Sequence, residues 1–125
     1  MVKISTDTST KVDITTKVGD SFYIKATLTD DSDTILNVPS FFGSDYVATL
    51  SVVNSSGEIA LGFSSGTAEG VFLSNSIVVD ETLGTLTVSA SGTQMGLRAN
   101  SFKYFLVISG SNATTTVFNG KLKVK

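Results

Sequence analysis

The sequence predicts an all-β domain, a two-sheet antiparallel β-sandwich of the immunoglobulin-like kind. Three observations favour this class. Apolar and polar residues alternate with a period of two along most of the chain, turn-forming residues separate the alternating runs, and 35 of the 125 residues are Ser or Thr. We expect about eight short strands and no helix, and a small β-barrel is the alternative architecture.

The first half of the chain contains four predicted strands. Residues 12–18 and 22–29 alternate in polarity and are the first two predicted strands. Residues 34–38 follow as a short strand that ends at Pro39, because proline has no amide hydrogen for a sheet ladder. Residues 46–54 carry apolar side chains on both faces, which predicts a strand in the centre of a sheet.

The second half continues the same pattern. Residues 58–63, 71–80 and 85–90 are predicted strands, and the second of them has an irregularity near Ser74–Asn75. Residues 101–109 are apolar on both faces and predict another central strand.

The final strand, residues 114–125, follows a polar hairpin turn. One face is predicted to be buried, and it carries Phe118, Leu122 and Val124. The opposite face carries Lys121, Lys123 and Lys125. Two interpretations of these lysines are open. They either pair with acidic side chains on neighbouring strands of the same sheet, or they form a basic surface that docks on a partner.

Charge is divided unevenly along the chain. Residues 1–90 hold all 11 acidic residues and four lysines, whereas residues 91–125 hold no acidic residue and five basic ones. The overall net charge of −2 therefore conceals a basic C-terminal segment.

The length of 125 residues indicates one domain. Residues 12–125 are expected to form the sandwich, and residues 1–11 an N-terminal arm that is flexible or packed on a neighbouring subunit. No run of 18 apolar residues occurs, so no transmembrane helix is expected, and residues 1–18 lack the apolar core of a secretory signal.

The residue types limit the chemistry. The chain has no His and no Cys, which excludes protease triads, disulfides and thiolate zinc sites. We therefore expect no enzyme activity, no catalytic residue, and no cofactor or metal. The densest acidic cluster, Asp30, Asp31 and Asp33, offers oxygen ligands for calcium, but it lacks the EF-hand spacing and is better explained as a solvated turn.

Phe41 and Phe42 are the one apolar pair in a predicted loop. Such a pair either anchors a partner or caps the open end of the core, and we favour the cap. The candidate partner contacts are Phe41, Phe42, Lys121, Lys123 and Lys125.

Four segments follow one another in a recognisable order: KVGDSFYIKATLTDD, YVATLSVVNSSGEI, IVVDETLGTLTVSAS and FKYFLVISGSNATTTVFNGKLKV. This order resembles the β-sandwich domain at the N-terminus of phage baseplate upper proteins and of related tail and head-fibre proteins. The chain departs from that pattern in RANSFKYF, which leads into the aromatic strand, and in stopping where the baseplate proteins continue.

The resemblance implies a non-enzymatic bacteriophage virion structural protein, as a head decoration, tail, baseplate or fibre-anchoring subunit. Its expected location is the virion, and its expected partners are other virion structural proteins and copies of itself, with no nucleic acid and no membrane. The alternative is a carbohydrate- or cell-surface-binding β-sandwich module, which would use Phe41, Phe42 and Tyr46 beside the acidic turn.

Overall fold

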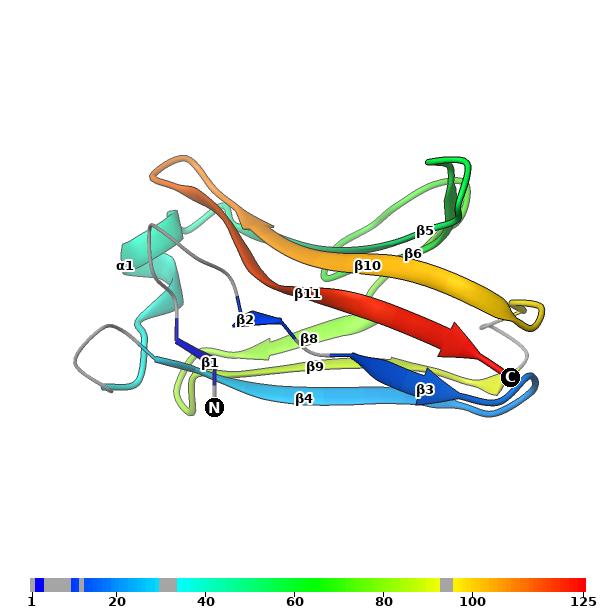
Figure 1. Ribbon diagram of the computed structural model, residues 1–125. Helices are drawn as coiled ribbons and strands as arrows, with labels where there is room; N and C mark the ends of the chain where they lie inside the picture. Colours follow the sequence, from blue (N-terminus) through cyan, green and yellow to red (C-terminus); the bar gives the residue numbers. More distant parts are fainter. Residues whose placement is uncertain (1, 4–9, 12, 30–33, 93–95) are drawn as a thin grey trace.

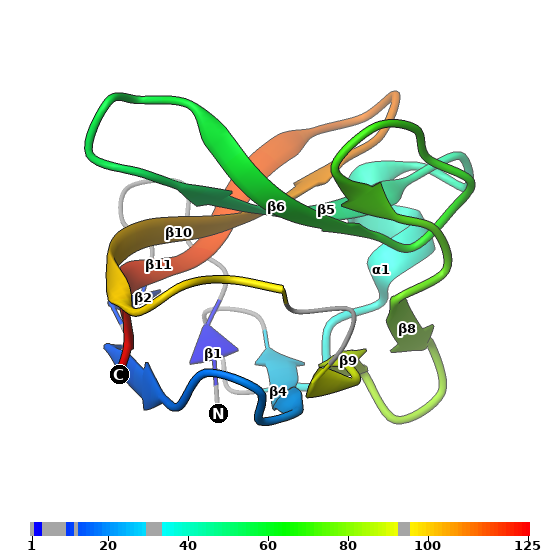
Figure 2. The same cartoon turned by 90° about the vertical axis from the view of Figure 1, so that its right-hand side faces the viewer.

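Two β-sheets face each other across one hydrophobic core, which confirms the predicted β-sandwich (Figures 1 and 2). The computed structural model describes the chain except residues 1, 4–9, 12, 30–33 and 93–95. The acidic turn predicted at residues 30–33 and most of the predicted N-terminal arm therefore lie outside the described residues.

The smaller sheet has four strands in the order β1-β4-β9-β8. They are β1 (Val2–Lys3), β4 (Phe22–Thr29), β9 (Thr85–Ala90) and β8 (Ile77–Asp80). β4 and β8 are antiparallel to β9, whereas β1 joins β4 in parallel. Part of the predicted N-terminal arm thus pairs with its own domain.

The larger sheet has seven strands. Six of them lie in the order β2-β11-β10-β5-β6-β7, and the seventh, β3, also pairs with β11. They are β2 (Thr10–Lys11), β3 (Ile14–Thr16), β11 (Thr114–Val124), β10 (Asn100–Ser109), β5 (Val47–Val53), β6 (Ile59–Ser64) and β7 (Phe72–Leu73). β5 and β10 are central, as predicted from their two apolar faces, and the neighbouring pairs from β11 to β6 are antiparallel. The strands at the edges of this sheet join it in parallel.

The core is built from the inward-facing positions of both sheets. On β10 these positions are Phe102, Tyr104, Leu106 and Ile108, all buried. The rings of Phe22 on β4 and Phe63 on β6 stack between the sheets at a centroid distance of 5.5 Å. Burial raises the pKa of Tyr104 to about 12, and the negative charge of Asp13 adds to the rise, so this phenol stays protonated at neutral pH.

A β-bulge controls which side chains of β11 face the core. The register changes between Leu106, which lies opposite Phe118, and Val107, which lies opposite Thr116. Val117 is the extra residue, and both Val117 and Phe118 are buried. Because a shift of one residue exchanges the two faces of a strand, the bulge turns Leu122 inward and Lys121 outward.

A short helix, α1 (Val38–Phe42), closes one end of the sandwich (Figure 1). The side chain of Asn37 accepts a hydrogen bond from the Ser40 amide at 3.3 Å, and Pro39 lies in the first turn. Asn is a preferred N-cap and Pro is well tolerated at the start of a helix. The predictions of a strand at 34–38 and of no helix are therefore wrong, and only Ile35 forms an isolated bridge with Thr29.

The turn between β10 and β11 is fastened to the end of α1. The Asn112 amide donates to the Phe42 carbonyl at 2.8 Å, and the Ser111 amide donates to the Asp45 carboxylate at 2.9 Å. The bond from Ser111 lowers the pKa of Asp45. A Cβ on Gly110 would lie 2.1 Å from the Phe42 carbonyl oxygen, so only glycine permits this approach.

Two further predictions are corrected. The segment 71–80 is not one strand, since β7 belongs to the larger sheet and β8 to the smaller one. Asn75, between them, has a φ of +54°, and this left-handed residue marks the crossing between sheets. The strand predicted at residues 12–18 is shorter, since β3 ends at Thr16, and Val18 beyond it is 54% exposed.

Deleting residues 121–125 is expected to prevent folding. Leu122 and Val124 are buried, and removing both would cost roughly 3–6 kcal/mol of burial free energy, which approaches the whole stability of a small domain. The deletion also removes the backbone bonds between Lys125 and both Thr16 and Val18. Thermal unfolding followed by circular dichroism measures the result. A cooperative transition in the shortened chain would contradict this expectation, and a full-length Lys123→Gln variant is the control.

Candidate functional site

The predicted aromatic contacts belong mainly to the core. Phe42 is fully buried, and Phe41 is half-buried with its ring 4.8 Å from that of Phe42 in an edge-to-face arrangement. The capping interpretation of this pair is therefore confirmed. Phe42 is therefore not exposed to a partner, and the acidic turn expected beside this pair lies outside the described residues.

The lysines are exposed, and their neighbours on adjacent strands are mostly not acidic. Lys121 lies opposite Lys103 on β10, and Lys123 lies opposite Ser101 on one side and Thr15 on the other. On the other side of β11, the Asp13 carboxylate accepts a hydrogen bond of 2.9 Å from the Lys121 backbone amide. The interpretation that these lysines pair with acidic residues of the same sheet therefore has one acidic neighbour in its favour and stays a prediction. Lys125 follows β11, and its backbone bonds to Thr16 and Val18.

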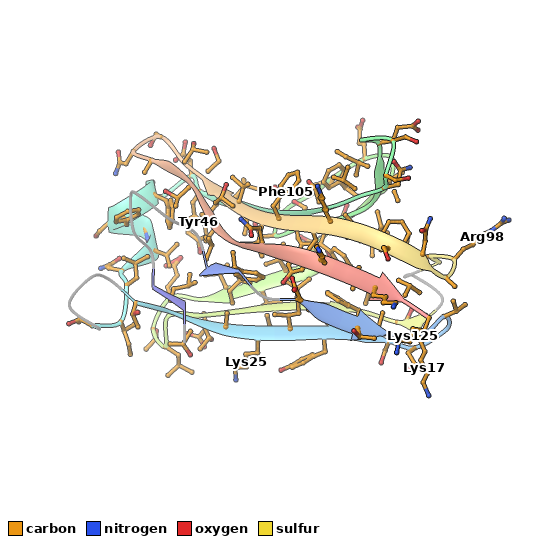
Figure 3. All side chains as sticks on the ribbon, viewed as in Figure 1. Lys17, Lys25, Tyr46, Arg98, Phe105 and Lys125 are labelled. Atoms are coloured by element: carbon orange, nitrogen blue, oxygen red, sulfur yellow. The ribbon has the colours of Figure 1, made fainter. Side chains whose placement is uncertain are left out.

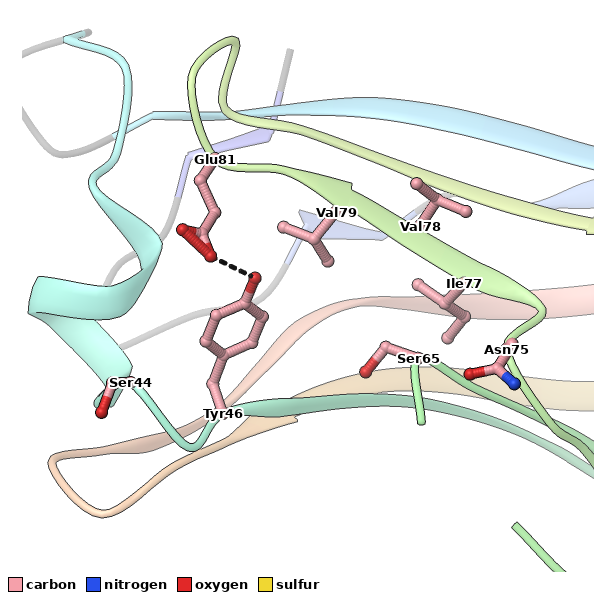
Figure 4. A pocket seen from close by; sticks show the side chains of 8 residues that line it. All are labelled: Ser44, Tyr46, Ser65, Asn75, Ile77, Val78, Val79 and Glu81. Carbon is pink, nitrogen blue, oxygen red and sulfur yellow. Dashed lines mark hydrogen bonds between the residues drawn. The ribbon is translucent and has the colours of Figure 1, made fainter. Parts of the chain in front are cut away.

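A groove of about 470 Å³ opens between the two sheets, beside β8 (Figure 4). We call it the inter-sheet groove. It is lined by Ser44, Tyr46, Ser65, Asn75, Ile77, Val78, Val79 and Glu81. Tyr46 precedes β5, Ser65 follows β6, and Glu81 follows β8, so strand ends from both sheets supply its walls.

Tyr46 and Glu81 bridge this groove. The Tyr46 hydroxyl donates a hydrogen bond of 3.2 Å to a carboxylate oxygen of Glu81. Partial burial raises the pKa of Tyr46, and the bond to Glu81 and its negative charge add to the rise. The phenol is therefore protonated at neutral pH and acts as a donor, while the carboxylate keeps acceptor positions for another group.

Two further polar side chains, Ser65 and Asn75, complete the lining. The Ser65 hydroxyl accepts a bond of 2.9 Å from the Ala48 amide, which leaves its own hydrogen to donate. The backbone amide of Asn75 donates to the Gly66 carbonyl at 2.9 Å, and this bond holds the residue in its left-handed conformation. The exposed Asn75 side chain offers both donors and an acceptor at the groove.

The groove contains one carboxylate among its lining residues, that of Glu81. The neighbouring Asp80 carboxylate instead accepts bonds of 3.0 Å from the Thr82 and Leu83 amides and so shapes the β8–β9 turn. Within the described residues no group of three or more His, Cys, Asp or Glu side chains comes together to hold a metal. The calcium interpretation of the acidic turn falls on residues that are not described.

Sequence reasoning named Tyr46 as a ligand contact but missed the other lining residues. Ser65, Asn75 and Glu81 are separated by up to 16 positions and lie at strand ends, so no local spacing marks them as one site. The one available signal was the irregularity at Ser74–Asn75, because an asparagine that interrupts a strand often adopts the left-handed conformation.

No family model and no curated protein matches the chain. Among solved structures, the chain is similar to the endo-β-1,4-mannanase from Thermotoga petrophila, with 14% sequence identity and a TM-score of 0.48. The match covers 90% of this chain but 18% of the mannanase chain. At this level the likeness supports no argument about fold or activity.

The predicted role as a bacteriophage virion structural protein is contradicted by this comparison, which names an endo-mannanase and no virion protein. The physical reason is that strand alternation and turn composition carried the resemblance, and unrelated sandwiches share both. No observation tests the location or the partners expected with that role. Among the described residues, no helix is long and apolar enough to cross a membrane.

The left-handed conformation of Asn75 is testable by substitution. Asn75→Ala is expected to lower the free energy of unfolding by about 1–2 kcal/mol, because a Cβ without a compensating side-chain bond is crowded in this conformation. Asn75→Gly removes the amide without that strain and is expected to unfold close to the wild type. Urea denaturation compares the two. An equal loss in both variants would show that the side chain, and not the backbone conformation, provides the stability.

Proposed function

We propose that the protein is a non-catalytic carbohydrate-binding module that holds a saccharide in the inter-sheet groove. The observation that carries the proposal is the bridge across this groove, in which the Tyr46 hydroxyl donates to the Glu81 carboxylate at 3.2 Å. The two residues flank strands of different sheets, Tyr46 before β5 and Glu81 after β8. An aromatic ring beside fixed hydrogen-bonding groups offers a sugar one surface for its C–H face and others for its hydroxyls.

The composition and size of the groove support this ligand class. Tyr46, Ser65, Asn75 and Glu81 together provide donors and acceptors, as a polyhydroxylated ligand requires. Ile77 and Val79 supply an apolar wall on β8. The volume of about 470 Å³ falls within the range of ordinary small-molecule sites, roughly 300–1,000 Å³.

The absence of a second carboxylate in the groove lining supports binding without hydrolysis. Glycosidases use two carboxyl groups on opposite sides of the scissile bond. Among the described lining residues Glu81 is the only acid, and the Asp80 carboxylate is bonded to the backbone of its own turn. A chain without histidine also lacks the usual substitute for a missing acid or base.

A glycan array followed by titration calorimetry tests the proposal. The wild type is expected to bind a subset of neutral glycans, and Tyr46→Ala, Glu81→Gln and Asn75→Gly are each expected to weaken binding about tenfold or more, since each removes part of the groove lining. Tyr23→Ala is the matched control, because Tyr23 is an exposed tyrosine on β4 that does not line the groove. Uniformly flat binding across the array, or equal losses in the control, would contradict a saccharide site here.

A further inference from the structure

The outer face of the larger sheet carries two lysines directly opposite each other. Lys103 on β10 and Lys121 on β11 are partners in the antiparallel register, and both are exposed. Like charges in directly opposite positions repel each other, so this pair opposes the stability of the sheet. The strand partner of Lys103 on its other side is Val53, which brings no negative charge. Beyond Lys121, the carboxylate of Asp13 accepts a hydrogen bond of 2.9 Å from the Lys121 backbone amide, so one negative charge lies beside two positive ones.

An aromatic ring and an amide continue this row. Phe105 is two residues from Lys103 on the same face, is 40% exposed, and lies opposite Asn119. Figure 3 shows Phe105 on the outer side of the sheet, away from the second layer. We call Lys103, Phe105, Asn119 and Lys121 the basic-aromatic face.

Two shallow hollows of about 410 and 430 Å³ lie along this face. Both are lined by Val53, Lys103 and Lys121, so the two lysines stand where the hollows meet. The first hollow adds Phe105 and Asn119, and the second adds Asn54, Ser55 and Ser101. The β5–β6 and β10–β11 turns rise at the two ends of the sheet, so the face is long and open (Figure 1).

We propose that the basic-aromatic face binds an acidic polysaccharide, with Lys103 and Lys121 on successive carboxylates and Phe105 against a sugar ring. Charge complementarity is the first argument, because an anionic ligand removes the repulsion between the two ammonium groups. This site lies on the opposite side of the larger sheet from the core and is independent of the inter-sheet groove, so it does not rest on the function proposed above.

The surroundings of the lysines favour a saccharide over an acidic peptide. β10 is hydrogen-bonded to β5 on one side and to β11 on the other, so it has no free backbone edge at which a peptide could add a strand. Recognition must come from side chains. The amides and hydroxyls of Asn54, Ser55 and Ser101 match the hydroxyl groups that a polysaccharide carries and a polyglutamate lacks.

The face is also poorly suited to single-stranded nucleic acid. Proteins that bind single strands stack successive bases on several exposed aromatic rings. Of the aromatic residues beside the two hollows, Phe102 and Tyr104 belong to the core, so Phe105 alone presents its ring to solvent.

Titration calorimetry with an oligogalacturonate and with its fully methyl-esterified form tests the proposal, because esterification replaces each carboxylate with a neutral methyl ester on the same sugar backbone. The wild type is expected to bind the free acid, to lose binding as NaCl is raised, and to bind the ester at least tenfold more weakly. Lys103→Gln and Lys121→Gln are each expected to weaken binding of the acid about tenfold. Phe105→Ser is expected to weaken binding of both the acid and the ester.

Matched variants separate this site from a general effect of charge. Lys17→Gln and Lys25→Gln change the net charge equally, and both lysines lie away from Phe105 (Figure 3), so binding is expected to be unchanged. Lys103→Glu is expected to lose binding but to melt no lower than the wild type, because it replaces a like-charge pair with an opposite-charge pair and its other strand partner is Val53. The proposal would be overturned if the wild type failed to bind the acid, or bound acid and ester equally. It would also be overturned by equal losses in the control variants, or by equally tight binding of polyglutamate or single-stranded DNA.

Discussion

The pairing of β10 with β11 determines most of what this domain presents to core and solvent. Its register runs from Asn100 opposite Val124 to Ser109 opposite Thr114, with one shift at the bulge. That shift allows Val117 and Phe118 to be buried in succession and turns Lys121 outward, toward the side of Lys103. The same hairpin ends in the turn that is bonded to α1, so the closed end of the sandwich depends on it as well.

The central strands were predictable because the pattern that identifies each of them lies within the strand's own sequence. Alternation assigned the buried faces of β5, β10 and β11, and the apolar residues on the second faces of β5 and β10 indicated that each has a neighbour on both sides. The end of residues 34–38 was misjudged for a related reason. Pro39 does end a strand, but Asn37 before it is also a good N-cap for a helix. The helix forms because it buries Phe42 in the core, a tertiary contact that the local sequence does not reveal.

The candidate sites were harder to predict, since they arise from the placement of strands and not from spacing. Tyr46 and Glu81 are 35 positions apart and meet only because the start of β5, in the larger sheet, comes close to the end of β8, an edge strand of the smaller sheet. Lys103 and Lys121 face each other only in the observed register, which the bulge sets. Without the bulge, the alternation of β11 would have directed Lys121 into the core, where burying an unpaired charge has a large free-energy cost.

In both proposed sites, the side chains are held in place by strands of the sandwich before a ligand binds. On β10, Tyr104 and Leu106 are locked in the core, and the intervening positions 103 and 105 are therefore held outward at a fixed separation. In the inter-sheet groove, the Ser65 hydroxyl is bonded to Ala48 and the Asn75 backbone to Gly66 before any ligand arrives. Because the groups are already ordered, a ligand would lose less free energy to ordering the protein, and binding would leave the sandwich unchanged. A β-sandwich with two such surfaces is therefore able to bind through side-chain chemistry alone.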